Sequence, residues 1–206
     1  MDFTFSEDQL LFQQSVRDFL VAEVTPERVR RLWETETGRD DGLWQQLTEL
    51  GLVGMTVPES HGGLGLNALD FVLLAQECGY VALPEPLVHT VLVAVPTLQE
   101  IGGDLAGQWL PQIAAGQARA VVGLEQNLLV EDAHVADLLL LQRGGELYAL
   151  GRDQVTLRHN ASVDPSRRLF AVEIDGKPAP LVGAAQAAPL LAAALDRGAL
   201  GCAAQA

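Results

Sequence analysis

A glycine-dense loop at residues 57–66, VPESHGGLGL, holds the residue types best suited to chemistry. His61 within it could act as a general base, because a histidine exchanges protons near neutral pH. The loop has no lysine or threonine where a phosphate-binding P-loop requires them, and no predicted strand precedes it. A loop histidine that no acidic side chain visibly orients is more often structural. We therefore expect no P-loop and keep both roles open for His61.

Charged side chains in the second half of the chain offer no paired arrangement. Asp153, Asp164 and Asp175 are scattered, and no spacing among them indicates a carboxylate dyad. Arg167 and Arg168 follow Asp164 closely and could grip a phosphate. A turn anchored by Asp–Arg contacts is the simpler interpretation, because aspartate favours turns.

Neither metal binding nor nucleophilic catalysis has a pattern in the sequence. The two cysteines, Cys78 and Cys202, lie far apart inside apolar helical patterns, and there is no CxxC or histidine-rich spacing. We expect both to be small hydrophobic residues in a reducing compartment. No Ser/His/Asp or Cys/His combination occurs, so we expect no metal and name no catalytic residue.

The charge balance excludes some classes of partner. Thirteen Lys and Arg stand against 27 Asp and Glu, giving a net charge of −14. This repels phosphate backbones and anionic membrane surfaces, so we expect no nucleic-acid or membrane partner. The first residues, Met1 to Thr4, lack the basic and apolar regions of a secretory signal. The apolar stretch at 87–98 is too short to span a bilayer, and we expect a cytoplasmic protein.

Helical periodicity and capping residues predict six helices in the first half of the chain. They run from Ser6 through at least Leu20, from the Thr25-Pro26 start to about Glu36, from an Asp41 cap to the Gly51 stop, from the Asn67 cap to Tyr80, from Glu85 to Ile101, and from Asp104 to Gly116.

The period changes near Ala118, and β patterns follow. The run at 136–142 is continuously apolar, as in a strand that is buried on both faces. Gly144-Gly145 predicts a hairpin and Asp175-Gly176 a turn. The expected strands are residues 120–125, 136–142, 146–150, 155–158 and 169–174.

A last helical pattern begins at Pro189 and runs to Ala206. It is apolar nearly all round, and it has no C-cap and no terminal cation. Such a helix requires burial on several sides. We expect the chain to be part of a larger folded unit.

Three stretches together resemble the acyl-CoA dehydrogenase family. Residues 47–67, LTELGLVGMTVPESHGGLGLN, match the family's helix ending LxxLGL and its VPExxGGxGx loop. The next helix, ALDFVLLAQECGY at 68–80, carries a glutamate as in the family. Residues 109–126, WLPQIAAGQARAVVGLEQ, resemble WLPxxAxGe followed by a strand reading xxALTEP. The order and spacing agree over nearly the whole chain.

The resemblance implies an α+β fold in three parts. An N-terminal all-α helical domain is followed by a small antiparallel β-barrel-like middle domain and the start of a C-terminal helix. We expect the helical domain at 1–117, an abbreviated middle domain at 118–184, and the start of a truncated C-terminal helical domain at 185–206.

The resemblance also implies a reaction and its participants. Members of the family bind FAD and an acyl-CoA between the middle and C-terminal domains. A glutamate takes the α-proton, and the flavin takes the β-hydrogen as hydride, leaving a 2,3-enoyl-CoA. The implied partners are an electron-transfer flavoprotein as acceptor and a homologous subunit in a homo- or heterotetramer.

Family positions transfer to two groups of residues. The cofactor-binding strand falls on Val121, Gly123, Leu124 and Glu125. The helix that lines the acyl pocket includes Leu87, Thr90 and Val91, although core or surface positions fit these residues equally well. His89 also lies on that helix.

The cofactor-binding motif is eroded in this chain. Where the family reads TEPxxGSD, Leu124 replaces the threonine, Gln126 replaces the proline, and no GSD follows. Leucine offers no hydrogen bond, so a contact that the family makes is lost. The family strand reading WxT has no counterpart either. We expect that a partner subunit completes the flavin site, as in the family's heteromeric members.

Three functions remain open. The first is a subunit or fragment of a flavin-dependent acyl-CoA dehydrogenase. The second is a catalytically silent scaffold subunit that stabilises a flavin-bearing partner. The eroded motif favours this second function or a flavin site shared with a partner, whereas the otherwise intact layout favours the first. The third is a self-sufficient helical binding module, which predicts that the chain folds cooperatively alone.

Overall fold

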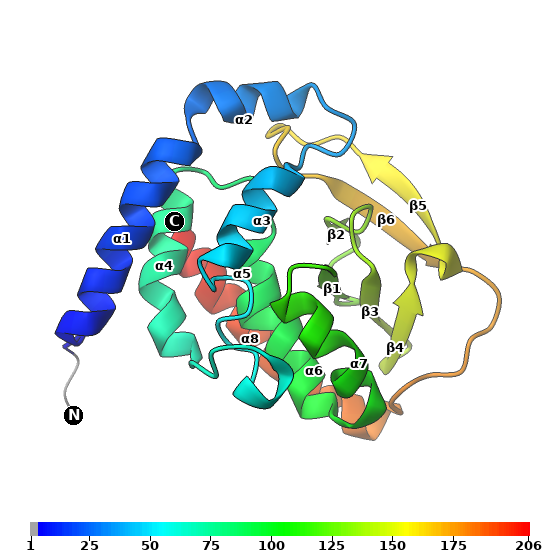
Figure 1. Ribbon diagram of the computed structural model, residues 1–206. Helices are drawn as coiled ribbons and strands as arrows, with labels where there is room; N and C mark the ends of the chain where they lie inside the picture. The colour runs from blue at the N-terminus through cyan, green and yellow to red at the C-terminus, as the bar shows by residue number, and fades with distance from the viewer. Residues whose placement is uncertain (1–3) are drawn as a thin grey trace.

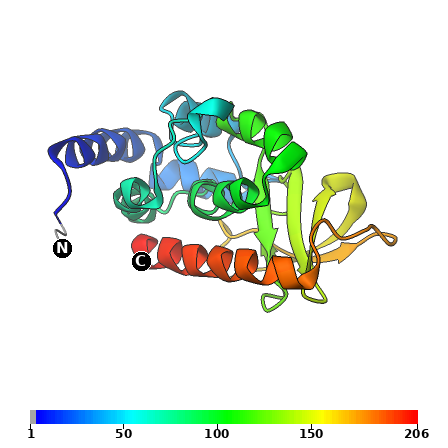
Figure 2. The same cartoon turned by 90° about the horizontal axis from the view of Figure 1, so that it is seen from below.

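The computed structural model describes residues 4–206, so the expectation for the first residues lies largely outside the described part, at Met1 to Phe3. Helices form one side of the molecule and two small sheets form the other (Figure 1). The last helix runs beneath both parts (Figure 2). This arrangement confirms the α+β fold class, while the exact domain boundaries stay predictions.

Capping residues decide where the N-terminal helices begin. Ser6 forms the predicted capping box, and Thr25 caps the helix that opens with Pro26. Asn67 is the predicted N-cap and also forms a capping box with Asp70. The expected Asp41 cap is wrong by one residue, because Asp40 accepts the hydrogen bond from Leu43 N. The helices are α1 (Glu7–Glu23), α2 (Pro26–Trp33), α3 (Asp41–Glu49), α4 (Ala68–Tyr80), α5 (Leu87–His89), α6 (Val95–Ile101), α7 (Gly103–Ala114) and α8 (Ala184–Gln205), with the short helical turns η1 (Glu59–His61), η2 (Thr90–Ala94) and η3 (Arg152–Gln154).

The helix expected over residues 85–101 is interrupted. It begins at Leu87 and contains the π-helical turn η2 between α5 and α6. Pro96 explains the interruption, because proline has no N–H to donate and its ring crowds the preceding turn. The wider turn presents five consecutive buried residues, Thr90 to Ala94.

Two three-stranded sheets make up the middle part. One has the order β1-β3-β4 and the other the order β2-β6-β5. Their strands pair antiparallel, except that β1 runs parallel to β3. The short β2 has no counterpart among the predicted strands, since two residues carry no periodicity. The strands are β1 (Ala120–Gly123), β2 (Val130–Glu131), β3 (Leu138–Arg143), β4 (Glu146–Gly151), β5 (Val155–Asn160) and β6 (Leu169–Ile174).

The last helix, α8, begins five residues before the expected Pro189. It packs against α4, α6 and η2. Among residues 4–206 it is the one helix long and apolar enough to cross a membrane by length and composition. Its packed face, which includes Leu191 and Ala194, joins the core of the helical part, so α8 is a structural helix of this fold. Leu195 and Leu200 are exposed on it.

The core divides into two clusters. The larger one joins the helices to one face of β1 through Val122 and Leu124. The smaller one lies between the two sheets and takes Val121 from the other face of the same strand. β1 therefore connects the helical part to the β part.

Candidate functional site

The predicted cofactor-binding strand is packed into the protein's own core. Val121 is 2% exposed and Leu124 is 9% exposed. A side chain at Gly123 would collide with Leu141 and Val130, so the space above this glycine is already filled. Each of these positions fits a structural role on β1.

Glu125 makes a well-defined contact at the end of β1. Its carboxylate accepts hydrogen bonds from Gly144 N at 2.9 Å and Gly145 N at 3.2 Å. These backbone donors hold the pKa of the Glu125 carboxyl below its usual range. The side chain therefore closes the β3–β4 hairpin, and the predicted cofactor contact is untested.

The predicted acyl-lining residues lie together on α5 and η2. Leu87, Thr90 and Val91 are fully buried in the helical core. The carbonyl oxygen of Val91 accepts a hydrogen bond from Thr56 Oγ1 at 2.8 Å. The Thr90 hydroxyl has no hydrogen-bond partner in the described structure. The burial fits the core position that the sequence left open, and the acyl contact stays a prediction.

A histidine on the predicted acyl-lining helix connects these two groups. His89 ends α5, and its Nε2 atom lies 3.0 Å from Val122 N of β1. Val122 N–H donates and His89 Nε2 accepts, so Nε2 carries no proton. Burial lowers the pKa of His89, which favours the neutral ring. A lone histidine on an apolar helix gave no signal for this contact.

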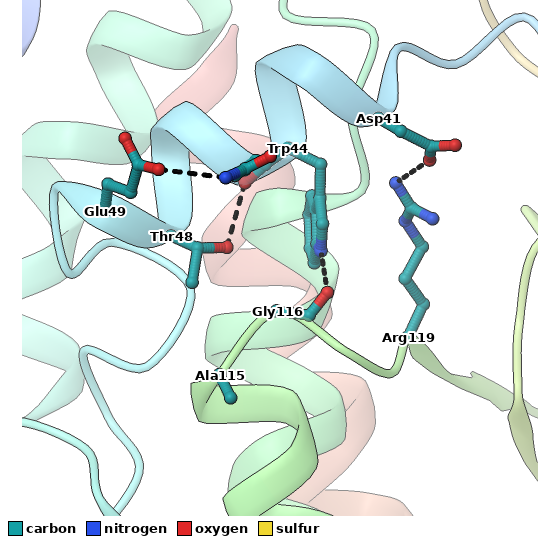
Figure 3. A pocket seen from close by; sticks show the side chains of 8 residues that line it. Asp41, Trp44, Thr48, Glu49, Ala115, Gly116 and Arg119 are labelled. Carbon is teal, nitrogen blue, oxygen red and sulfur yellow. Dashed lines mark hydrogen bonds and ion pairs between the residues drawn. The ribbon is translucent and has the colours of Figure 1, made fainter.

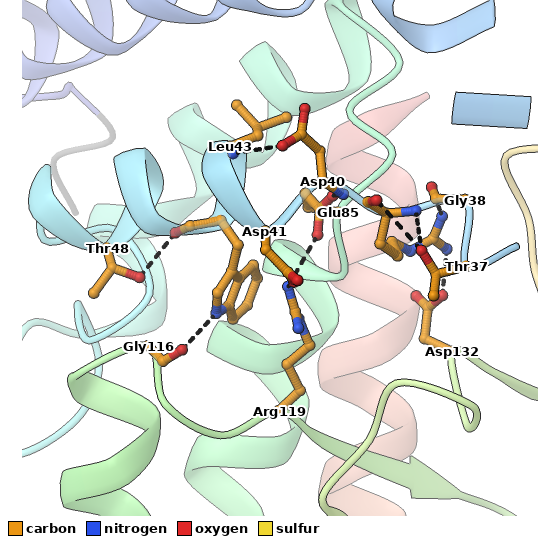
Figure 4. A network of polar contacts seen from close by, with 12 residues as sticks. Thr37, Gly38, Asp40, Asp41, Leu43, Thr48, Glu85, Gly116, Arg119 and Asp132 are labelled. Atoms are coloured by element: carbon orange, nitrogen blue, oxygen red, sulfur yellow. Dashed lines mark hydrogen bonds and ion pairs between the residues drawn. The ribbon is translucent and has the colours of Figure 1, made fainter. Parts of the chain in front are cut away.

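A buried ion-pair network lies where the loop before α3 meets the β part (Figure 4). Arg39 pairs with Asp132, and both side chains are almost fully buried. Arg119, just before β1, lies 3.0 Å from Asp41 and 3.7 Å from Glu85. Sequence reasoning missed this network, because its members are distant along the chain.

Burial changes the acidity of two carboxyls in that network. It raises the pKa of Glu85 to about 7, although the Asp40 backbone N–H and the charge of Arg119 oppose the rise. It also raises the pKa of Asp132, against the opposing charge of Arg39. Desolvation disfavours the charged form of a carboxyl, which explains both directions.

Two surface pockets lie away from the predicted site residues. The first, of about 380 Å³, is shown in Figure 3. Its Trp44 donates from Nε1 to Gly116 O at 3.1 Å, and Arg119 covers the Trp44 ring. This first pocket is lined by Asp41, Trp44, Gln45, Thr48, Glu49, Ala115, Gly116 and Arg119. The second pocket, of about 550 Å³, lies between the glycine loop and α8.

The glycine loop has a structural explanation. Gly63 N donates to Pro58 O and Gly65 N to Val57 O, which closes the loop on itself. Gly62 has a positive φ of 83°, a conformation that glycine adopts without strain. His61 ends the helical turn η1 and is partly exposed. The folded loop fits the structural role of this histidine, and nothing tests the catalytic one.

The expected turn at Asp164 contains an Asp–Arg contact, because Arg167 N donates to Asp164 O at 3.1 Å and Ser166 N donates to the Asp164 side chain. The guanidinium of Arg167 pairs instead with Glu131. Arg168 donates to the carbonyl oxygens of Trp33 and Thr35, so both arginines are bound to the protein itself.

Cys78 is buried as expected, and burial raises the pKa of its thiol to about 12. Cys202 is exposed on α8.

Comparison with known proteins places this arrangement in a family. The acyl-CoA dehydrogenase N-terminal domain family matches residues 6–117. "Acyl-CoA dehydrogenase IpdE2" of Mycolicibacterium smegmatis is 30% identical over 198 residues, covering 94% of this chain and 61% of that protein.

Solved structures share the fold. The "Tcur3481-Tcur3483 steroid ACAD G363A variant" superposes with a TM-score of 0.80 at 22% identity, over 95% of this chain and 62% of that one. The ChsE4-ChsE5 complex from Mycobacterium tuberculosis gives a TM-score of 0.77 at 22% identity, over 92% of this chain and 61% of that one. The chain thus spans about three fifths of each of these relatives. From the matched helical domain, which covers more than half of its length, the chain belongs to the acyl-CoA dehydrogenase family.

Proposed function

We propose that this protein is a subunit of a flavin-dependent acyl-CoA dehydrogenase that oxidises an acyl-CoA thioester to the 2,3-enoyl-CoA. The junction of α5 and η2 with β1 carries the proposal, because it brings the predicted acyl-lining helix against the predicted cofactor strand. Family membership and the shared fold support the same reaction class. We assign no catalytic base to this chain.

The residues predicted to hold FAD do not fit a complete flavin site. The side chains of Val121 and Leu124 are apolar, and they are packed in the core. Glu125 is engaged by the hairpin amides, and the space at Gly123 is filled. We therefore derive no step through the flavin from this chain, and we propose that a homologous subunit completes the site.

The proposed partners follow from this assignment. They are an acyl-CoA substrate, an electron-transfer flavoprotein as acceptor and a homologous acyl-CoA dehydrogenase subunit in a homo- or heterotetramer. Two structural neighbours, Tcur3481-Tcur3483 and the ChsE4-ChsE5 complex, have paired names, which supports a heteromer. We propose a cytoplasmic location, and the net charge of −14, which repels anionic membrane surfaces, supports it.

One observation favours a second function, that of a scaffold subunit. All four residues of the predicted cofactor strand have structural roles in this chain. In that case the protein stabilises a flavin-bearing partner without touching the flavin.

Co-purification separates the two functions. The complete protein is co-expressed with its homologous genomic neighbour, and the flavin content of the complex is compared with that of the partner alone. The dehydrogenase proposal predicts a yellow complex whose flavin content depends on this chain. A stable complex without flavin, or a partner that holds its flavin equally well alone, would support the scaffold.

A further inference from the structure

His89 makes a hydrogen bond between the helical part and β1. β1 is an edge strand, since its sheet has the order β1-β3-β4. Val122 N–H is directed out of that sheet to His89 Nε2 at 3.0 Å. A buried edge amide needs an acceptor, because an unpaired buried N–H is costly. His89 supplies that acceptor from a helix 33 residues away in sequence.

Among the described residues, no other hydrogen bond joins α5 or η2 to β1 or α8, and the apolar packing there does not by itself fix the register. η2 packs against β1 on one side and against α8 on another. At the α8 contact, Gly201 lies close to Val88 and Leu92, and a methyl group there would meet Val88 at 2.9 Å. Hydrophobic contact is non-directional, whereas a hydrogen bond fixes distance and angle.

We propose that His89 is a positioning residue that locks α5 and η2 against β1 through a neutral imidazole protonated on Nδ1. The lock sets where the fully buried Leu87, Thr90 and Val91 stand relative to the strand. It thereby fixes the wall of the acyl pocket. This last step rests on the proposed function, while the hydrogen bond and its tautomer do not.

Three variants separate the hydrogen bond from simple packing. His89→Gln keeps an acceptor oxygen at a similar reach, whereas His89→Leu fills the apolar space without an acceptor. His61→Gln is the matched control, because His61 lies in the glycine loop away from β1. All are made in the complete protein, in its complex if it forms one.

Amide hydrogen exchange at Val122 is the first measurement. We expect His89→Leu to speed exchange about tenfold or more, as loss of one buried hydrogen bond implies, and His89→Gln to restore most of the protection. His61→Gln leaves Val122 unchanged. If Val122 exchanges equally slowly in His89→Leu, the lock does not exist.

Nitrogen-15 NMR of the unmodified protein gives a second measurement that needs no variant to fold. The proposal predicts a proton on His89 Nδ1 and an unprotonated Nε2. A proton on Nε2 would overturn it, because that nitrogen could not accept from Val122.

Steady-state kinetics tests the positioning role. His89→Leu should raise KM for the acyl-CoA several-fold, and His89→Gln should recover most of it. Unchanged KM in His89→Leu would overturn the positioning role. A complex that oxidises no acyl-CoA contradicts the proposed function instead. The hydrogen exchange of the Val122 amide and the tautomer of His89 still show whether the hydrogen bond between them exists.

Discussion

Arg39 and Asp132 form an ion pair that is buried where the helical part meets the β part, with side chains 2% and 6% exposed. Arg39 also donates to Ser166 O, so one guanidinium holds two loops of the β part. Asp132 has a φ of 61°, a left-handed conformation that is uncommon for residues other than glycine. The surrounding contacts must hold this conformation in place.

Breaking this pair on one side should destabilise the protein strongly. Arg39→Met leaves the Asp132 carboxylate buried without its cation, which typically costs about 3–5 kcal/mol of unfolding free energy. Urea titration followed by circular dichroism measures the change. Arg30→Met, which breaks the exposed pair with Glu27, is the control and should have little effect.

The double variant Arg39→Met, Asp132→Asn tests whether charge matters, because asparagine is neutral and also tolerates the left-handed φ of this position. Removing both charges should recover much of the lost stability, because no buried charge is left unpaired. If the double variant is no more stable than Arg39→Met, the ion pair is not the cause of the loss.

Glu85 should make stability depend on pH. Its folded pKa of about 7 lies above its ordinary value of 4.5, so the folded state binds the proton more tightly. The stabilisation from this group is complete below pH 4.5 and is lost as pH rises through 7, by roughly 3 kcal/mol in total. Glu85→Gln keeps the acceptor for Asp40 N and should flatten this part of the profile.

Thermal unfolding at pH 5 and pH 8 measures the effect of Glu85. The control is Asp41→Asn, which alters the exposed carboxyl beside the same Arg119. An equal pH dependence in Glu85→Gln and the unaltered protein would show that this carboxyl ionises normally.

Two glycine-to-alanine variants should shift stability in opposite directions. At Gly201 a methyl group would meet Val88 at 2.9 Å and Leu92 at 3.3 Å, so Gly201→Ala should cost about 1–2 kcal/mol through overpacking. At Gly107, inside α7, the methyl group meets nothing, and alanine should add about 0.5–1 kcal/mol. Denaturant midpoints measure both, and a stabilising Gly201→Ala would mean that α8 packs less closely than described.

A variant at Glu125 tests whether this side chain, just after β1, has the structural role of holding the β3–β4 hairpin. Glu125→Ala removes the carboxylate that binds Gly144 N and Gly145 N, so hydrogen exchange at these two amides should accelerate. Glu173→Ala, which alters an exposed side chain on β6, should leave them unchanged. Loss of flavin without faster exchange would show instead that Glu125 contacts the cofactor.

Local signals predicted much of the fold. The caps at Ser6 and Asn67 depend on residues within one turn, and β6 has the expected bounds, residues 169–174. The cap at Asp40 was missed by one residue, because two adjacent aspartates compete and tertiary contacts decide. Arg28 pairs with Asp40, which fixes that choice.

The junction could not be predicted in the same way. His89 meets Val122, and Arg39 meets Asp132 across 93 residues. Such pairs form only when the whole chain folds, and no periodicity encodes them. The family resemblance predicted which residues of the sequence line the acyl pocket and bind the cofactor. The packing of these residues decides which of their groups remain free to contact a ligand.

Anaerobic titration of the purified complex with acyl-CoA tests the central claim most directly. If this protein is a working subunit of a flavin-dependent dehydrogenase, the visible flavin band bleaches with the thioester, and bleaching is lost when this chain is omitted. A complex that contains this chain and shows no thioester-dependent bleaching, with a partner that bleaches fully alone, would contradict the account.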